Sequence, residues 1–370
     1  MTQFWVGGYG ADMEGDAEGI GLLSVDDGGG PSTLRHRGTA APVASPSWLA
    51  AHPTLDVVYA ALEGAGTVRA FARAGEAALC PLGEPLRAGE GVCHLAVSPG
   101  GRMLIASCYG DGRVVRFGIA DDGTLVPAGI DKAAALRAAL FGGREVDEQP
   151  DADPQRARDP HPTPAGDEPR ASHAHAAVFL PDGRIATTDL GFDLVRIWRA
   201  AAGFGGLALD HEVVLPRGTG PRHMLLHPSG HLHVVTEYSC EVFTLASAPD
   251  GSWGLVAATP ASPIAQVGSD FPAELAVSRD GDTLYTALRG SNTLAALRVR
   301  GGGEVLEPLA LADSGVDWPR HHLVYDGTLL VAGQRSGTVG VVDLDGRTGA
   351  PRDVRHVTEA PTPTVILPAR

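Results

Sequence analysis

The segment from Val92 to Phe117 reads VCHLAVSPGGRMLIASCYGDGRVVRF. It contains three short runs rich in Val, Leu and Ile, separated by the turns Pro99-Gly100-Gly101 and Gly110-Asp111-Gly112. Such turns supply the positive φ angles that tight hairpins need, and the apolar runs between them are typical of short strands. The segment therefore predicts three antiparallel strands joined by two hairpins.

The same pattern recurs along the chain. Further copies run from Pro46 to Phe71, His173 to Trp198, Pro221 to Leu245, Pro272 to Leu297 and Pro319 to Val342. The residues that close the second strand of each copy are Glu63, Tyr109, Asp189, Glu237, Arg289 and Gln334, at intervals of 46, 80, 48, 52 and 45 residues. Tyr9, 54 residues before Glu63, supplies a seventh mark. Seven units fit the roughly 4–8 blades of a β-propeller, so we predict an all-β, seven-bladed propeller of four-stranded antiparallel blades.

The two ends of the chain predict how the ring closes. Residues 4–9 form a second strand with no first strand before it, and residues 363–368 form a first strand with no second. If these strands share one blade, no sheet edge is left exposed, and residues 1–370 form a single domain.

The interval of 80 residues contains an insertion, residues 131–171. It begins with a helix-like run, residues 133–140, and continues with Pro, Asp, Glu and Arg and few apolar residues. This composition predicts a mobile surface loop. The sequence leaves open whether the loop is a lid over one mouth of the channel or a solvated insertion.

Charge and composition narrow the classes of partner. A formal net charge of −15 argues against binding nucleic acid or anionic lipid. The chain shows no signal peptide and no apolar run of the ~20 residues that a membrane span needs. Its four cysteines form no CxxC pair. We expect a cytoplasmic protein with no membrane or nucleic-acid partner; the oligomeric state stays open, and a monomer fits the sequence.

Ionisable residues gather where the repeat predicts one mouth of the channel. In a propeller, the start of each first strand lies at the same mouth as the end of the second strand. The first position carries Cys93, His94, His175, Arg222, His223, Glu274, Arg320 and His321, and the second carries the closing residues given above. Such a ring suits acid–base chemistry or anion binding. Structural ion pairs, for example between Arg222 and Glu237, are the alternative reading.

No metal or cofactor is expected from these residues. His173 and His175 alternate on one strand face, but no third ligand stands at a recognisable metal-binding spacing. The sequence also lacks a GxSxG elbow, an HExxH motif and a phosphate-binding P-loop.

Several of these motifs, taken in order, resemble the propeller-type lactonases, the bacterial 6-phosphogluconolactonase family. The resemblance rests on residues 93–99 with 109–112, 173–178, 220–228, 234–237 and 288–291, and it spans the whole chain except the insertion. It implies a seven-bladed propeller that hydrolyses 6-phosphogluconolactone, a reaction of carbohydrate metabolism and the pentose phosphate pathway, without a metal. The family also has a fungal carboxymuconate lactonising branch, in which a His, two Arg and a Glu in the channel are implicated; by motif, the resemblance implies that these are His175 (or His173), Arg222, Arg289 and Glu237 here.

The resulting hypothesis is a hydrolase that opens a small anionic sugar lactone. Glu237 or His175 would act as the general base, and Arg222 and Arg289 would stabilise the oxyanion or hold the anionic group. The residues expected to contact substrate are Arg320, His94, Tyr109, His173, His223 and Asp189.

Other functions remain open. A carboxymuconate-type cycloisomerase would use the same acid–base and arginine set without water. A non-catalytic propeller that binds a ligand or a protein is a further alternative, as is a family member that has lost its substrate. The family often has Asn and Pro where this chain has Thr236 and Cys93, which keeps the last alternative open.

Overall fold

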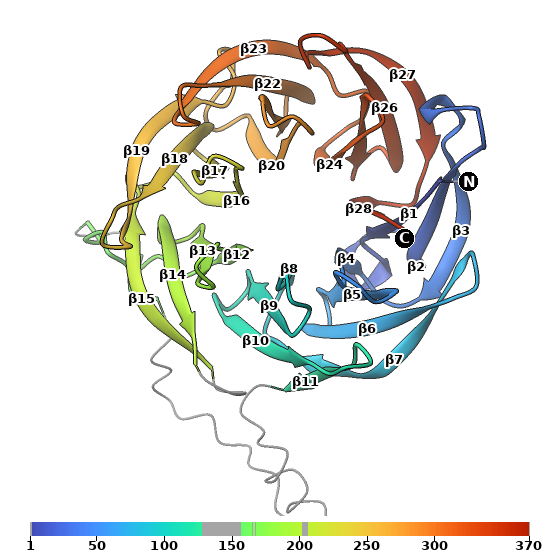
Figure 1. Ribbon diagram of the computed structural model, residues 1–370, viewed down its shortest axis with the longest axis horizontal. Helices are drawn as coiled ribbons and strands as arrows, with labels where there is room; N and C mark the ends of the chain where they lie inside the picture. The colour runs from blue at the N-terminus through green and yellow to red at the C-terminus, as the bar shows by residue number, and fades with distance from the viewer. Residues whose placement is uncertain (1, 128–156, 165, 167, 202–205, 370) are drawn as a thin grey trace, which may run out of the picture.

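The computed structural model is a ring of seven four-stranded antiparallel sheets around a central channel (Figure 1). It describes residues 2–127, 157–164, 166, 168–201 and 206–369. The prediction of an all-β, seven-bladed propeller is confirmed. Within the described residues the only helical elements are two short 3-10 turns, η1 (Ala11–Met13) and η2 (Pro31–Thr33).

Each blade begins with an inner strand that lines the channel. The inner strands are β4 (Pro46–Ala51), β8 (Val92–Val97), β12 (Ala174–Phe179), β16 (Pro221–Leu226), β20 (Phe271–Val277), β24 (Pro319–Tyr325) and β28 (Pro363–Pro368). The second strands, in the same blade order, are β5 (Val57–Leu62), β9 (Met103–Cys108), β13 (Ile185–Asp189), β17 (Leu232–Thr236), β21 (Thr283–Arg289), β25 (Thr328–Gly333) and β1 (Thr2–Gly8).

The outer half of each blade carries two more strands. The third strands are β6 (Thr67–Ala74), β10 (Val114–Ile119), β14 (Leu194–Ala200), β18 (Glu241–Ser247), β22 (Thr293–Arg300), β26 (Thr338–Leu344) and β2 (Gly19–Val25). The outermost strands are β7 (Ala78–Arg87), β11 (Leu125–Pro127), β15 (Leu207–Val214), β19 (Trp253–Pro260), β23 (Val305–Asp313), β27 (Pro351–Glu359) and β3 (Arg35–Pro42). Second strands are almost fully buried and third strands mostly so, whereas the outermost strands are largely exposed. The apolar core lies between neighbouring blades.

The two chain ends close the ring as predicted. Strand β28 pairs antiparallel with β1, and Trp5 lies opposite Leu367. The closing blade packs tightly on the next one, because a Cβ atom on Gly7 would lie 2.1 Å from the carbonyl oxygen of Pro46. Val365 and Ile366 of the last strand are 1% and 2% exposed, which makes the C-terminal strand part of the core.

A β-bulge interrupts the inner strand of every blade near its start. The bulged segments contain Ser47, Cys93, His175, Arg222, Ala273, Arg320 and Thr364. A bulge inserts one extra residue and breaks the strict alternation of side chains between the two sheet faces. Consecutive residues of the inner strands can therefore both turn toward the axis, which places two layers of side chains in the channel.

The described part of the insertion lies against the third-strand side of its blade. Arg170 forms an ion pair with Asp159 at 2.5 Å and another with the buried Asp193. Ala157 packs with Phe192 and Leu194. The sequence predicted a mobile loop across residues 131–171 and did not reveal these contacts, because they follow no regular spacing along the chain. The helix-like run, residues 133–140, and the lid hypothesis lie outside the described residues.

Candidate functional site

One carboxylate organises the mouth of the channel where the inner strands begin. Glu237, directly after β17, receives two guanidinium groups on its Oε2 atom: Nε of Arg222 at 2.9 Å and Nη2 of Arg289 at 2.8 Å. Arg222 comes from the bulge of β16 in the same blade, and Arg289 ends β21 in the next blade. The three side chains thus join two neighbouring blades at the channel mouth.

Backbone carbonyls fix both guanidinium groups in place. Arg222 donates from Nη1 to the carbonyl oxygen of Ala273 at 2.5 Å, and Arg289 donates from Nε to that of Phe271 at 2.9 Å. The guanidinium of Arg289 also lies 5.4 Å from the ring centre of Trp318, within cation–π range. Arg222 is 4% exposed and Arg289 is 5% exposed, and these contacts hold both side chains in place.

Arg320 enters the same mouth from the bulge of β24. Its Nη1 donates to Oε1 of Gln334 at 3.1 Å, and its guanidinium lies 5.1 Å from the ring centre of Tyr9. The Tyr9 hydroxyl donates to Glu63, with O–O distances of 3.2 and 3.3 Å. We call Arg222, Glu237, Arg289 and Arg320 the arginine layer.

The electrostatics of the arginine layer favour a bound anion. Three guanidinium groups face two carboxylates, those of Glu237 and Glu63. Burial alone would raise the pKa of Glu237, but Arg289 and Arg222 outweigh it, and the pKa lies below its ordinary value. Burial, together with the neighbouring Arg222, lowers the pKa of Arg289 to about 10, which still leaves it charged at neutral pH.

His175, the bulged residue of β12, is 5% exposed, and its Nδ1 atom has no hydrogen-bond partner in the structure. Burial lowers its pKa well below the ordinary value, and the charges of Arg222 and Arg320 lower it further. His175 is therefore a neutral imidazole at neutral pH, with one buried ring nitrogen that has no hydrogen-bond partner.

His173 has a different environment from His175. Its Nδ1 donates to the carbonyl oxygen of Tyr109 at 2.6 Å, and its ring stacks on that of Tyr109, with centres 4.4 Å apart. Asp189 accepts hydrogen bonds from the backbone N–H groups of His173 at 2.9 Å and Phe192 at 3.1 Å. Asp189 thus fixes the backbone around His173. The sequence led us to expect that Asp189 contacts substrate and did not predict these backbone hydrogen bonds.

A second layer of side chains lies one residue further along the inner strands. The histidine layer, as we call it, consists of Trp48, His94, His223, Glu274 and His321. The ring centre of Trp48 lies 4.4 Å from that of His94, 5.7 Å from that of His223 and 5.5 Å from that of His321. Because these residues belong to blades around the ring, their contacts cross the axis and obstruct the channel below the arginine layer.

The ionisable side chains of the histidine layer are buried and uncharged at neutral pH. Burial lowers the pKa of His94 and of His321 to about 3 each, and that of His223 well below its ordinary value. Burial raises the pKa of Glu274 to about 8, with Arg222 opposing the shift. His223 lies 3.6 Å from Glu274 Oε1, and His321 lies 4.0 Å from Oε2.

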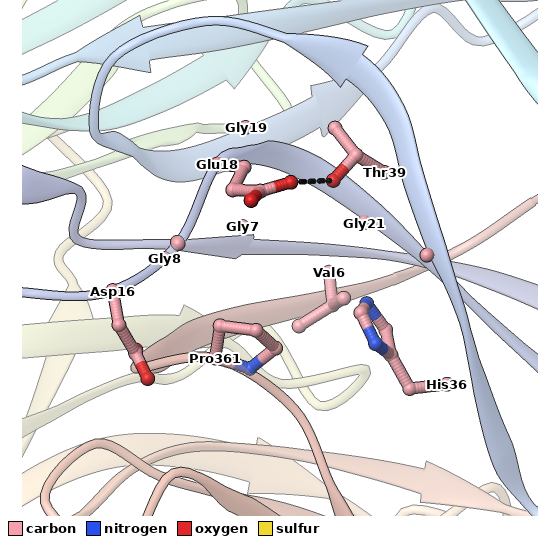
Figure 2. A pocket seen from close by; sticks show the side chains of 12 residues that line it. Val6, Gly7, Gly8, Asp16, Glu18, Gly19, Gly21, His36, Thr39 and Pro361 are labelled. Atoms are coloured by element: carbon pink, nitrogen blue, oxygen red, sulfur yellow. Dashed lines mark hydrogen bonds between the residues drawn. The ribbon is translucent and has the colours of Figure 1, made fainter.

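Outside the channel, a hollow of about 290 Å³ lies on the closing blade (Figure 2). Glycines on β1 and β2 leave its space open, since a Cβ atom on Gly21 would lie 2.7 Å from the His36 ring. Its acidic residues, Asp16 and Glu18, are exposed, and Glu18 accepts a hydrogen bond from Thr39 at 3.4 Å. None of the residues predicted for the site lines this hollow.

In the described ranges, no three His, Cys, Asp or Glu side chains lie close enough together to hold a metal ion. No described helix is long and apolar enough to cross a membrane.

Comparison with known families agrees with this architecture. The family described as "Lactonase, 7-bladed beta-propeller" matches residues 3–368. The chain belongs to this family. The resemblance inferred from the sequence motifs is therefore confirmed at the level of the family, and lactone hydrolysis is its named activity.

Known proteins match the lactonase propeller over nearly its whole length. It is 24% identical over 377 aligned positions to a 6-phosphogluconolactonase of Bacillus subtilis, covering 99% of this chain and 98% of the relative. The periplasmic gluconolactonase PpgL of Pseudomonas aeruginosa has a similar structure, with a TM-score of 0.80, 21% identity and coverage of 100% and 99%. A Lactobacillus plantarum protein of solved structure gives the same TM-score and identity, with coverage of 100% of both chains. These structural likenesses establish the fold.

The structure brings together most of the residues that the sequence singled out. Arg222, Glu237 and Arg289 are in direct contact, and Arg320 and His175 come from the same ring of bulges. His94 and His223 lie one layer deeper. Trp48, at the centre of the histidine layer, was missed. Its position directly after the bulge residue Ser47, the equivalent of His94 and His223 in other blades, is the signal that could have found it.

Proposed function

We propose that this lactonase propeller hydrolyses a small anionic sugar lactone, with 6-phosphogluconolactone as the first candidate. The observation that carries the proposal is the arginine layer, whose three guanidinium groups face the carboxylate of Glu237 within the layer and that of Glu63 beside it, in a protein of net charge −15. A cationic site in an acidic protein is suited to an anionic ligand. The name of the Bacillus subtilis relative, which the chain matches over nearly its full length, supports the same substrate class.

Ester opening needs a base for the attacking water and positive groups for the oxyanion that develops on the carbonyl oxygen. Arg222 and Arg289 provide the positive groups, because both are buried and held by backbone carbonyls. Preorganised donors in a water-poor site act more strongly than the same groups in water. Arg320, near the same mouth, would hold the phosphate or carboxylate of the substrate.

Of the two candidate bases, His175 fits the geometry better than Glu237. Glu237 carries two guanidinium groups on one oxygen, and its lowered pKa makes it a weak base. Its role is to position Arg222 and Arg289. His175 is neutral and keeps an unpartnered Nδ1 atom, so it can accept a hydrogen bond from water at neutral pH.

The remaining residues form the walls of the proposed site. His94 and His223 close its floor with Trp48, and Tyr109 stacks on His173 at its side. Asp189 contributes by holding His173 in place.

We further propose that the enzyme works without a metal or cofactor and in the cytoplasm, within the pentose phosphate pathway.

The experiment is hydrolysis of freshly prepared 6-phosphogluconolactone by purified protein, measured above the spontaneous rate, with and without EDTA. Catalysis that survives EDTA supports the proposal. Catalysis lost with EDTA would contradict metal independence. No catalysis would overturn the proposed substrate and favour the cycloisomerase or a binding role, which a carboxymuconate assay then separates.

A further inference from the structure

A cavity of about 330 Å³ lies at the end of the channel opposite the arginine layer. Its walls come from the inner strands of three consecutive blades, largely from their ends, and from the middle of β4. The apolar lining residues are Leu49, Ala276, Val277, Leu323, Val324, Val365, Ile366, Leu367 and Pro368. The histidine layer separates this cavity from the arginine layer, so the two ends of the channel are distinct compartments.

The base of the cavity is polar and unsatisfied. Glu274 lines it with only 8% of its side-chain surface exposed, and its Oε2 atom has no hydrogen-bond partner. His322 also lines the cavity and is 2% exposed. Its Nε2 donates to the carbonyl oxygen of Tyr285 at 3.2 Å, which leaves Nδ1 as an acceptor without a partner. Buried polar atoms in proteins are normally satisfied, so the unpartnered atoms of Glu274 and His322 beside one cavity indicate a missing hydrogen-bonding partner.

The aromatic group at the base favours the same kind of ligand. The Trp48 indole N–H is used by the carbonyl oxygen of Leu95 at 3.2 Å, so the ring offers its π surface rather than a donor. A cation is attracted to an indole face and to a carboxylate, whereas an anion would be repelled by the ionised Glu274 and would meet the acceptor atom of His322. The net charge of −15 also draws cations to the protein.

We propose that this cavity is a second ligand site, which binds a small organic ammonium ion with an apolar body. The ammonium group donates to Glu274 and His322 and contacts the Trp48 ring. The alkyl part lies against the aliphatic walls. This site is separate from the lactone site and does not depend on its chemistry.

Binding should depend on pH through Glu274. The groups that face Glu274 are His223 and Arg222 from β16, His321 from β24 and, one contact further, His94 from β8. The three histidines have lowered pKa values and stay neutral above pH 7. The ammonium ion pairs best with the ionised carboxylate, whose pKa is about 8 in the empty site. Affinity should therefore rise about tenfold between pH 7 and pH 9, as the ionised fraction of Glu274 rises by that factor.

The test is calorimetric titration of the full-length protein with n-butylammonium chloride at pH 7, 8 and 9, with n-butanol and sodium butyrate as matched probes. We expect saturable binding of butylammonium alone, which tightens with pH. Glu274→Gln, which keeps the shape and removes the charge, should weaken binding at pH 9 at least tenfold. Glu76→Gln, which removes an exposed carboxylate far from the cavity, should leave it unchanged.

A cavity-filling variant makes the test independent of the folding of Glu274→Gln. Ala276→Leu places a larger side chain in the cavity and should abolish binding, while thermal melting verifies that the protein is folded. Absence of saturable binding at pH 9, equal binding of butanol, or unchanged affinity in Glu274→Gln or in Ala276→Leu would overturn the proposal. Lactone hydrolysis, measured in parallel, distinguishes failure of this site from failure of the proposed function.

Discussion

The bulge residues Arg222 and Arg320 and the residues directly after them, His223 and His321, lie in two different layers of the channel, one ionic and one uncharged. In the arginine layer, Arg222 and Arg289 stay charged because a carboxylate and backbone carbonyls surround them. In the histidine layer, burial without charged partners keeps His94, His321 and Glu274 neutral at pH 7. The comparison teaches that the same bulge geometry supplies either an ionic site or an uncharged floor, depending on which side chain follows.

Removing the C-terminal strand should destroy both layers. Deletion of residues 361–370 removes Thr364 and Val365, the β28 residues at the bulge position and directly after it, and exposes the edge of β1. We expect the melting temperature to fall by more than ~10 °C, because several kcal/mol of apolar burial is lost. Deletion of residues 369–370 alone serves as the control. An unchanged melting curve for the longer deletion would show that the clasp does not hold the ring.

Arg222→Ala should disrupt the arginine layer and leave the side chains of the histidine layer in place. Removal of one preorganised donor for the oxyanion costs roughly 10²–10³ in kcat. The measurement is steady-state hydrolysis of 6-phosphogluconolactone. Arg300→Ala, an exposed arginine paired only with Glu307, is the matched control and should keep full activity. Full activity in both Arg222→Ala and Glu237→Gln would refute the assignment of the site.

Glu237→Ala should destabilise the arginine layer, because it removes the carboxylate that pairs with two of its arginines. Two buried guanidinium groups lose their shared carboxylate, and breaking a buried ion pair from one side costs about 3–5 kcal/mol. Urea unfolding at pH 7 measures the loss. Glu307→Ala, at an exposed pair, should change the free energy of unfolding by less than about 1 kcal/mol.

The buried ionisable groups of the histidine layer should make the free energy of unfolding depend on pH. His94 and His321 have lowered pKa values in the folded state, so the unfolded chain binds more protons below pH 6.5 and stability falls as the pH drops toward 3. Glu274 acts in the opposite sense, since its raised pKa means that stability falls as the pH rises from about 4.5 to 8.

Urea unfolding of wild type and Glu274→Gln between pH 4.5 and 8 isolates the smaller of these effects. The variant should lose the decline that Glu274 causes, roughly 1.4 kcal/mol per pH unit within that window at most. Parallel curves for the two proteins would contradict a neutral, buried Glu274.

The repeat allowed the fold to be predicted from the sequence. Marks such as Glu63, Tyr109 and Glu237 recur at nearly constant spacing because each blade needs the same strand lengths and turns. The same logic placed Arg222, Arg289 and Glu237 at one mouth, and the ion pairs between them agree with that placement.

What the sequence did not reveal depends on register and on contacts across the ring. Single bulged residues, which shift alternation by one, separate His175 from His173 and Arg222 from His223. Trp48 was missed because its partners His94, His223 and His321 lie in other blades, 46 or more residues away. The contacts of Arg170 with Asp159 and Asp193 span 11 and 23 residues and follow no strand or helix periodicity, so no sequence pattern indicated them.

The most direct test of the central claim, that the arginine layer binds an anionic lactone, compares two substrates. It measures kcat/KM of the wild-type protein for 6-phosphogluconolactone and for glucono-1,5-lactone, which lacks the phosphate. Charge-assisted hydrogen bonds of about 1.5–3 kcal/mol predict a preference of roughly 10- to 100-fold for the phosphorylated lactone, lost at high salt. Equal values, or a preference for the uncharged lactone, would contradict the account.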